Sequence, residues 1–390
     1  MNHYVINDYI FNIDESEINV IYSNEYKTEI LINKSLREYL QKIKTEIDHH
    51  TSKWDIYKKI TNKYEFINTN IHLDKYKNIS VCKYKPISRS YFKMIEILNC
   101  FTFNFSNKIK SFHLAEGPGG FIEALQQYRN NNQDKYIGMT LMDNEDDVPK
   151  WHKITNFLKK HRNIFLEYGP KKDGNLYLKH NLLYIKDHYK NSIDFITADG
   201  GFDYSIDFNK QEENSINLIF SEILYALILQ KIGGSFILKV YDIFHLNTIE
   251  MMYLLSYFYE SVYIYKPNTS REANSEKYII CKNFEKKSNY ENIIHKLIHL
   301  FENLNKQKLN RIFNIQLNNY FLSKIQEINA IYGQQQIENI LKKINYIKEE
   351  ESNSNYNREK FDKIKMNNID KCIKWCKLYN QPIHSDFLHG

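Results

Sequence analysis

The sequence predicts an α/β fold in which a mainly parallel sheet carries helices on both faces. Apolar runs of strand length alternate with helical patterns through the middle of the 390-residue chain. One of these runs ends in the glycine-rich turn Gly117-Pro118-Gly119-Gly120, and a helical pattern begins near Phe121. In an open α/β sheet such a turn lies at the carboxyl end of a strand, where ligands bind.

Six strands are expected from this alternation. They cover residues 111–116, 135–141, 193–199, 235–241, 261–266 and 276–282. A loop over 267–275 joins the last two, and it is too short for a helical crossover. We therefore expect the last strand to be antiparallel to its neighbour.

Composition divides the chain into three expected regions: an N-terminal extension of mixed structure over 1–85, the α/β domain over 86–285, and a helical region over 286–390. The last region holds 17 Lys and Arg against 11 Asp and Glu, whereas the first 285 residues balance at 36 each. This basic excess suits contact with a polyanion, and it equally suits a solvated helical surface.

Several classes of protein are disfavoured. The five cysteines are sparse and odd in number, which argues against a disulfide framework and for a reducing compartment. We find no signal-like N-terminus and no apolar stretch long enough to cross a bilayer, so we expect a soluble intracellular protein without a membrane partner. No Cys and His residues are grouped as metal ligands, so no metal is expected.

Four charged residues are candidates for chemistry. Asp199 ends an expected strand and precedes two glycines, and Lys239 lies inside an apolar strand, where burial without a partner is costly. A buried lysine can act as a base if its pKa falls, although nearby carboxylates oppose that shift. Glu276 opens the last strand, where a solvated acid is an equally good interpretation. Lys93 taken alone is an ordinary lysine on a helix surface.

The ordered set of motifs resembles the FtsJ-like ribose 2′-O-methyltransferases, and most closely the mRNA cap-1 branch of eukaryotes and large DNA viruses. The similarity covers about residues 87–284. Its motifs are Glu116-Gly117-Pro118-Gly119-Gly120-Phe121, Gly138-Met139-Thr140-Leu141, Ala198-Asp199-Gly200-Gly201, Leu238-Lys239-Val240-Tyr241-Asp242 and the segment over 266–278.

The resemblance implies a Rossmann-like, S-adenosylmethionine-dependent methyltransferase domain over 86–285, with a Lys-Asp-Lys-Glu tetrad. Carried over by motif, the tetrad is Lys93, Asp199, Lys239 and Glu276, with Lys239 as the general base. The turn from Glu116 to Phe121 would hold the methionine and ribose parts of the donor, and Asp199 would also face its amino group.

The adenine contact departs from the family pattern. The cap branch often has an acid near the adenine, whereas this chain has Asn175 in the turn over 173–177. Asn175 would accept a hydrogen bond from the adenine amino group through its amide oxygen.

The RNA-facing candidates lie in or near the tetrad segments, and Arg and Lys side chains there would hold phosphates. They are Lys85, Arg89, Lys266, Ser270 and Arg271. For Lys85 and Lys266, solvated surface is an equally good interpretation, whereas Arg89 and Arg271 lie inside matching motifs.

The expected function is methylation of the first transcribed nucleotide of capped mRNA, with the capped 5′ end as partner and other capping or transcription proteins as further partners. The alternatives are ribose methylation of ribosomal or transfer RNA, and a non-catalytic RNA-binding capping subunit. A residue composition typical of AT-rich genomes, with the viral resemblance, points to a large DNA virus. The expected location is the cytoplasm, at a viral replication site or in the virion, with the nucleus as an alternative.

Overall fold

The computed structural model describes residues 3–7, 11–26, 32–73, 76–142, 151–201, 208–352 and 357–388. They belong to two compact units, each assembled from segments far apart in the chain. Unit 1 comprises Met1–Lys34, Thr102–Lys266 and Glu276–Asn329, and unit 2 comprises Ser35–Phe101, Pro267–Ser275 and Ala330–Gly390. The division of the sequence at residues 85 and 285 stays a prediction.

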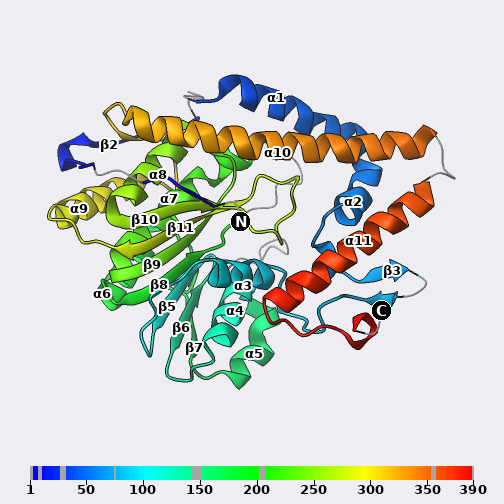
Figure 1. Cartoon of the computed structure of the whole chain (residues 1–390). Helices are drawn as coiled ribbons and strands as arrows, with labels where there is room; N and C mark the ends of the chain where they lie inside the picture. Colours follow the sequence, from blue (N-terminus) through cyan, green and yellow to red (C-terminus); the bar gives the residue numbers. More distant parts are fainter. Residues whose placement is uncertain are drawn as a thin grey trace. The chain divides into compact units, whose positions relative to one another are not determined.

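Unit 1 is organised around an eight-stranded sheet with the order β1-β10-β11-β9-β8-β5-β6-β7 (Figure 1). Strands β7, β6, β5, β8 and β9 are parallel, and β11 runs antiparallel to both β9 and β10. This confirms the predicted α/β class and the antiparallel last strand. The bounds are β1 (His3–Val5), β5 (Lys110–Leu114), β6 (Lys135–Met139), β7 (Ile164–Glu167), β8 (Ile193–Ala198), β9 (Gln230–Val240), β10 (Tyr259–Tyr265) and β11 (Lys277–Phe284).

The order of the strands reverses beside β5. From β5 the chain moves outward to β6 and β7, and it then returns to place β8 on the other side of β5. At such a switch point the connections leave the sheet in opposite directions, so a crevice opens beyond the carboxyl ends of the two strands. The crevice between β5 and β8 is therefore the place in this fold where a ligand is expected.

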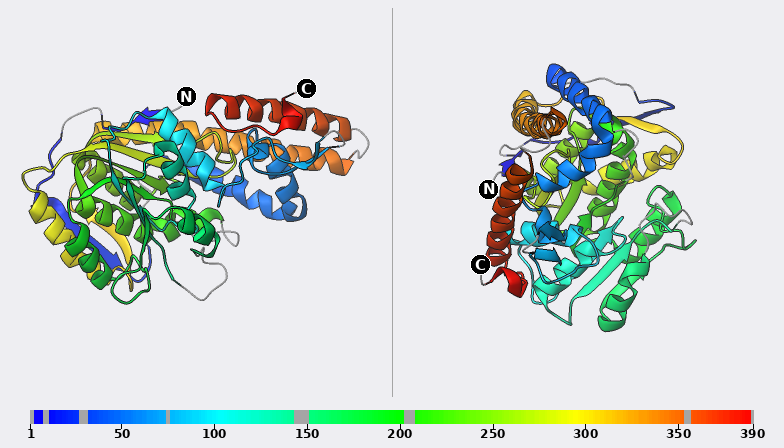
Figure 2. Two further views of the ribbon diagram at one scale, coloured as in Figure 1. Left: turned by 90° about the horizontal axis from the view of Figure 1, so that it is seen from below. Right: turned by 90° about the vertical axis from the view of Figure 1, so that its right-hand side faces the viewer.

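Helices flank the sheet (Figures 1 and 2). Helices α6, α7 and α8 form a contiguous layer, with α7 packed against both of the others and against β9. Helix α4 packs against β6, and right-handed crossovers place α4 and α5 on the opposite face. The bounds are α4 (Gly120–Arg129), α5 (Thr155–Lys160), α6 (Lys179–Tyr189), α7 (Gln211–Leu229), α8 (Leu246–Phe258) and α9 (Tyr290–Leu300).

Four strands of unit 1 were not expected from the sequence. β7 lies on one edge of the sheet and β1 on the other, and β12 (Lys308–Phe313) pairs with β2 (Ile18–Ser23) in a separate ribbon. All are short or lie at edges, where periodicity is a weak signal. The region after residue 285 is otherwise helical, as predicted. None of the helices in the described part of the chain is long and apolar enough to cross a membrane.

Unit 2 is largely helical. It contains a two-stranded ribbon, β3 (Ile71–Leu73) with β4 (Tyr76–Ile79), and the part of α10 from Ala330 onward. Its helices are α1 (Lys34–Thr45), α2 (Thr51–Ile60), α3 (Ser90–Cys100), α10 (Asn319–Ser352) and α11 (Asn357–Leu378).

A buried carboxylate ties three segments of unit 2 together. Glu65 is 1% exposed, and Arg89 Nη1 lies 2.8 and 2.7 Å from its two oxygens. Arg271 donates to the same carboxylate from Nε at 3.1 Å and from Nη2 at 2.8 Å. Burial alone would raise the pKa of Glu65, but Arg271 and Arg89 outweigh burial and lower the pKa to about 2.

Replacing this carboxylate tests its contribution to stability. We expect Glu65→Gln to lower the free energy of unfolding at pH 7 by about 3 kcal/mol, because two guanidiniums lose their buried anion. Since the folded pKa is depressed, the stabilisation is complete above the unfolded value of about 4.5 and is lost as pH falls toward 2.

Urea titrations at pH 7 and pH 3 measure this difference. Glu338→Gln, an exposed acid on α10, serves as the matched control. A gap between wild type and Glu65→Gln that is as large at pH 3 as at pH 7 would contradict the assignment.

Candidate active site

The register of the sheet brings the predicted motifs to one edge. Leu114, the last residue of β5, pairs with Ala198 at the end of β8, and Ala198 in turn pairs with Leu238 of β9. Lys239 pairs with Tyr278 near the start of the antiparallel β11. The ends of β5, β8 and β9 therefore meet the beginning of β11 at the switch-point edge.

Asp199 and Lys239 form the centre of this edge. Lys239 Nζ lies 3.3 Å from Asp199 Oδ1 and donates to the Asp199 backbone oxygen at 2.7 Å. The Tyr278 hydroxyl donates to Asp199 Oδ1 at 2.8 Å. The side chains of Lys239 and Asp199 are only 10% and 14% exposed, so water screens the pair weakly.

The environment of Lys239 keeps it protonated in the absence of ligand. Burial alone would lower the pKa of Lys239, as the sequence argument allowed. Asp199, the Tyr241 phenol and Glu276 outweigh burial and raise the pKa above its ordinary value. Lys239 is therefore an ammonium ion held in a fixed position by its neighbours.

The structure brings three of the four tetrad candidates together. Glu276 directly precedes β11, is 7% exposed and acts electrostatically on Lys239. Lys93 lies on α3, which belongs to unit 2, whereas the other three candidates belong to unit 1. The participation of Lys93, and the catalytic role of the tetrad, stay predictions.

The sequence analysis missed Glu222 on α7. It is 1% exposed, and burial, with Asp199 as a further cause, raises its pKa to about 8. The Gly200 backbone N–H donates to this carboxyl group, and Glu222 Oε1 is buried without a hydrogen-bond partner. The available signal was an acid inside an otherwise apolar helix, which is costly unless it has a partner.

The two glycines after Asp199 allow these groups to approach closely. A Cβ on Gly201 would lie 3.1 Å from Lys239 Nζ and 2.5 Å from the Tyr241 hydroxyl. A Cβ on Gly200 would collide with Glu222 Oε1. The Gly-Gly pair therefore fits around the lysine and the buried acid, and a side chain at either position would displace them.

The turn after β5 places a second acid at the same edge. Glu116 Oε1 accepts the Phe121 N–H at 2.6 Å and the Ile122 N–H at 3.4 Å, so it caps the start of α4. Gly119 has a φ of 112°, and a Cβ there would collide with Ile154. The Gly117–Pro118 peptide bond is cis. The sequence placed Glu116 and Asp199 at strand ends, and both lie just beyond the last strand residue.

The second carboxyl oxygen of Glu116, Oε2, indicates that the site suits a cationic ligand. Glu116 Oε2 is buried without a hydrogen-bond partner, and burial and the charge of Asp199 raise the pKa of Glu116 well above its ordinary value. With Glu222 nearby, Lys239 is surrounded by more carboxyl groups than it can neutralise. A cationic ligand would supply the missing charge, and S-adenosylmethionine carries both a sulfonium and an ammonium group.

Asn175 lies next to the end of β6. The turn that carries it is held by the Met142 N–H, which donates to Asp173 O at 2.8 Å. Asn175 Oδ1 accepts the Tyr177 N–H at 2.9 Å, and the amide group of Asn181 donates to Asn175 O at 2.9 Å. A carbonyl oxygen has two lone pairs, so Asn175 Oδ1 retains capacity for one more donor. Its contact with adenine stays a prediction.

The RNA-facing candidates have different surroundings. Lys85 Nζ donates to Asn68 O, Asn70 Oδ1 and Ser80 Oγ, and burial lowers its pKa. These bonds use all three of its donors within unit 2.

In unit 1, Lys266 Nζ donates to Glu276 O at 2.9 Å. The other candidates belong to unit 2. Ser270 is buried and donates to Asn274 Oδ1 at 3.3 Å. Arg89 and Arg271 share Glu65, so this trio keeps a net positive charge, and their side chains are 25% and 33% exposed. RNA contact by any of these residues stays a prediction.

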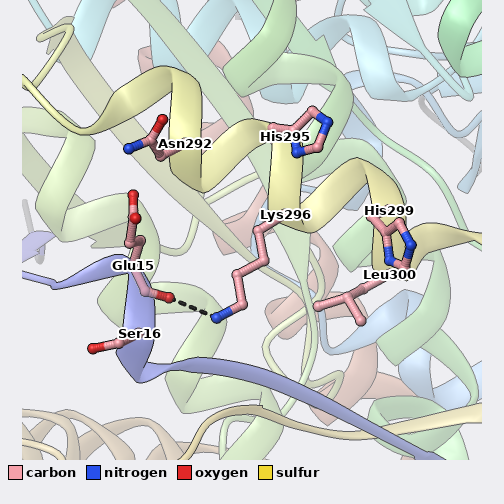
Figure 3. Close-up of a pocket in the computed structure, with 7 residues that line it drawn as sticks. All are labelled: Glu15, Ser16, Asn292, His295, Lys296, His299 and Leu300. Atoms are coloured by element: carbon pink, nitrogen blue, oxygen red, sulfur yellow. Dashed lines mark hydrogen bonds between the residues drawn. The ribbon is translucent and has the colours of Figure 1, made fainter.

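A surface depression with a volume of about 560 Å³ lies elsewhere on unit 1, and Figure 3 draws the residues that line it. Lys296 Nζ on α9 donates there to the backbone oxygen of Glu15 at 2.8 Å. None of the predicted site residues lines it. The lining residues are Glu15, Ser16, Asn292, His295, Lys296, His299 and Leu300.

Comparison with known proteins identifies relatives of this chain. The family model of the FtsJ-like methyltransferases matches residues 86–284, about half of the chain. Cap-specific mRNA (nucleoside-2'-O-)-methyltransferase 2 of Danio rerio is 30% identical over 278 residues, which cover 68% of this chain and 36% of that protein. Probable methyltransferase EP424R of African swine fever virus is 31% identical over 218 residues, 50% of this chain and 49% of that protein.

A third relative is cap-specific mRNA (nucleoside-2'-O-)-methyltransferase 1 of Drosophila melanogaster, 36% identical over 174 residues, 43% of this chain and 21% of that protein. The chain thus spans half or less of the length of these relatives. The family match confirms the resemblance expected from the motifs. The chain belongs to the FtsJ-like methyltransferase family, whose members use S-adenosylmethionine as the methyl donor.

Proposed function

We propose that this protein methylates the ribose 2′-hydroxyl of RNA, and that its substrate is the first transcribed nucleotide of capped mRNA. The observation that carries the proposal is Lys239 held against Asp199 at the switch-point edge, beside the carboxyl groups of Glu116, Glu222 and Glu276. The cap-specific relatives support the choice of capped mRNA over ribosomal or transfer RNA.

The chemical task assigned to Lys239 is removal of the hydroxyl proton. A ribose hydroxyl is a weak acid and needs a base within hydrogen-bond reach. When bound, S-adenosylmethionine would supply a methyl group on a positively charged sulfonium, and transfer of that group to the hydroxyl oxygen would break the bond between the methyl carbon and sulfur. The positive charge of the donor, held next to Asp199, would offset the carboxylates that raise the pKa of Lys239 and so would lower that pKa. Neutral Lys239 Nζ then takes the hydroxyl proton.

The neighbours of Lys239 have positioning roles in this proposal. Asp199 and Glu276 fix the amine, and Tyr278 orients Asp199 through its 2.8 Å hydrogen bond. Glu116 holds the turn up to Phe121, which would cradle the donor, and Asn175 would contact its adenine. We assign Lys93 to the same tetrad.

RNA contacts are proposed on the second unit. Arg89 and Arg271 are oriented by Glu65 and present partly exposed guanidiniums suited to phosphate. A cytoplasmic location, in a large DNA virus, and association with other capping or transcription proteins stay predictions.

Replacing the base tests the function directly. We expect Lys239→Met to reduce methyl transfer to capped RNA by at least 10²-fold, because no other amine occupies that position in the described part of unit 1. The measurement is transfer of labelled methyl groups to matched capped and uncapped RNAs. Lys231→Met, on the same strand but 54% exposed and paired with Asp194, is the control and should keep the wild-type rate.

Three results would contradict this proposal. Equal rates for wild type and Lys239→Met would remove the proposed base. Equal methylation of capped and uncapped RNA by the wild type would favour ribosomal or transfer RNA as substrate. Absence of any transfer by the wild type, together with RNA binding, would favour the non-catalytic alternative.

The pH dependence tests the coupling between Lys239 and Asp199. A base acts in its deprotonated form, so kcat/KM should rise with pH up to the pKa of Lys239 in the free enzyme. Asp199 raises that pKa. Asp199→Asn should therefore lower it and move the rising limb to lower pH, with a reduced plateau.

The measurement is the pH profile of kcat/KM for the two proteins. Asp194→Asn, at the other end of β8, is the matched control and should keep the wild-type profile. A limb that stays in place or moves to higher pH in Asp199→Asn would contradict the assigned coupling.

A further inference from the structure

Unit 2 contains a group of four lysines around a single carboxylate, Glu272. The lysines come from three separate segments, and none of them belongs to a motif of the methyltransferase family described above. We call the group the Glu272 lysine cluster. Its members are Lys63 after α2, Lys342 and Lys343 on α10, and Lys371 on α11.

An ion pair and hydrogen bonds bring these segments together within the unit. Lys63 Nζ forms an ion pair with Glu272 Oε1 at 2.5 Å. Cys372, the neighbour of Lys371, donates from Sγ to Lys63 O at 3.5 Å, so α11 lies against the same turn. Gln336 on α10 donates to Ala273 O at 3.1 Å, next to Glu272. The cluster is therefore fixed by the packing of unit 2.

The lysines of the cluster act electrostatically on one another as well as on Glu272. Lys343 is 2% exposed and donates to Asn339 O at 3.2 Å. The pKa of Lys343 is lowered to about 8, mainly by burial; Glu272 opposes this shift, and Lys342 and Lys63 add to it. Burial, Lys63 and Lys342 likewise lower the pKa of Lys371. The protein's own acid leaves positive charge in excess here, and an anion would compensate it.

The cluster is accessible to a ligand. Lys63 and Lys342 are exposed and Lys371 is half-buried, so three ammonium groups reach the solvent around a buried fourth. Glu272 lies in the same loop as Arg271, which is proposed to contact RNA, and four residues before Glu276 in the sequence. Three members of the cluster, Lys342, Lys343 and Lys371, also lie within residues 286–390, the region whose basic excess suits a polyanion.

We infer that the Glu272 lysine cluster binds backbone phosphates of the RNA substrate, on the 3′ side of the nucleotide that is methylated. This inference rests on the proposed function. When the methylated nucleotide is the first, every further phosphodiester of the RNA lies on its 3′ side. Lysines act on phosphates as point charges, so recognition is independent of base sequence and sensitive to salt.

The test compares short and long RNA. Fluorescence anisotropy measures the affinity of capped RNAs of about 3 and about 20 nucleotides between 50 and 200 mM salt. We expect Lys342→Gln/Lys371→Gln to weaken binding of the longer RNA by about 5- to 20-fold and to reduce the slope of log affinity against log salt by about 1.4, or 0.7 per lost contact. The affinity for the shorter RNA should change by less than twofold.

Matched variants separate the cluster from overall charge. Lys348→Gln/Lys377→Gln removes the same charge from exposed positions on the same two helices and should leave long-RNA binding within about twofold of wild type. Lys342→Arg/Lys371→Arg keeps both charges and should retain wild-type affinity and salt slope.

The outcomes distinguish this inference from the proposed function. If the wild type methylates the short capped RNA but the Gln pair binds the long RNA as tightly as wild type does, the inference fails and the function stands. If the control pair loses as much affinity as the cluster pair, the inference also fails, because net charge alone then explains binding. If the wild type methylates no RNA, the proposed function fails first.

Discussion

The active site depends on one buried ion pair at the switch point of the sheet. Lys239 and Asp199 are adjacent because β8 and β9 are parallel neighbours in register, and Tyr278 completes the arrangement because β11 enters the same edge from the opposite direction. A lysine alone would be too costly to bury there, and so would an aspartate. Each makes the burial of the other tolerable, and the surrounding strands keep both in place.

Charge is distributed unequally between this edge and unit 2. At the edge, several carboxyl groups surround Lys239, and Glu116 and Glu222 each keep a buried oxygen without a hydrogen-bond partner. In unit 2 the imbalance has the opposite sign, with four lysines around Glu272. A methyl donor is a cation and RNA is a polyanion, so each excess suits one of the two ligands of the proposed reaction. This complementarity is a property of named side chains rather than of the modest net charge of +6.

Much of the fold and part of the site followed from the sequence. The ends of the apolar runs located Asp199 and the Glu116 turn, because parallel strands place their carboxyl ends at one edge. The loop over 267–275 was short enough to require an antiparallel last strand. The resemblance supplied the grouping of Lys239 with Glu276, since spacing alone could not favour Glu276 over an ordinary solvated acid.

Other features required coordinates because they arise between distant segments. Lys239 and Asp199 on the sheet act electrostatically on Glu222 of α7, and helical periodicity does not reveal this contact between elements. The sharing of Glu65 by Arg89 and Arg271 joins residues more than 180 positions apart in the chain. β1 lies far from its partner β10 in the sequence, and a three-residue strand gives no periodic signal.

The central claim is that the amine of Lys239 takes the proton from the ribose hydroxyl. Chemical rescue tests it most directly: Lys239→Ala, shown to be folded and to bind S-adenosylmethionine, is assayed for methyl transfer to capped RNA with increasing concentrations of small primary amines. We expect added amine to restore transfer in proportion to the concentration of its neutral form, because the free base replaces the missing side chain. A folded, donor-binding variant that no amine of any size or basicity rescues, or one that already transfers at the wild-type rate, would rule out Lys239 as the base.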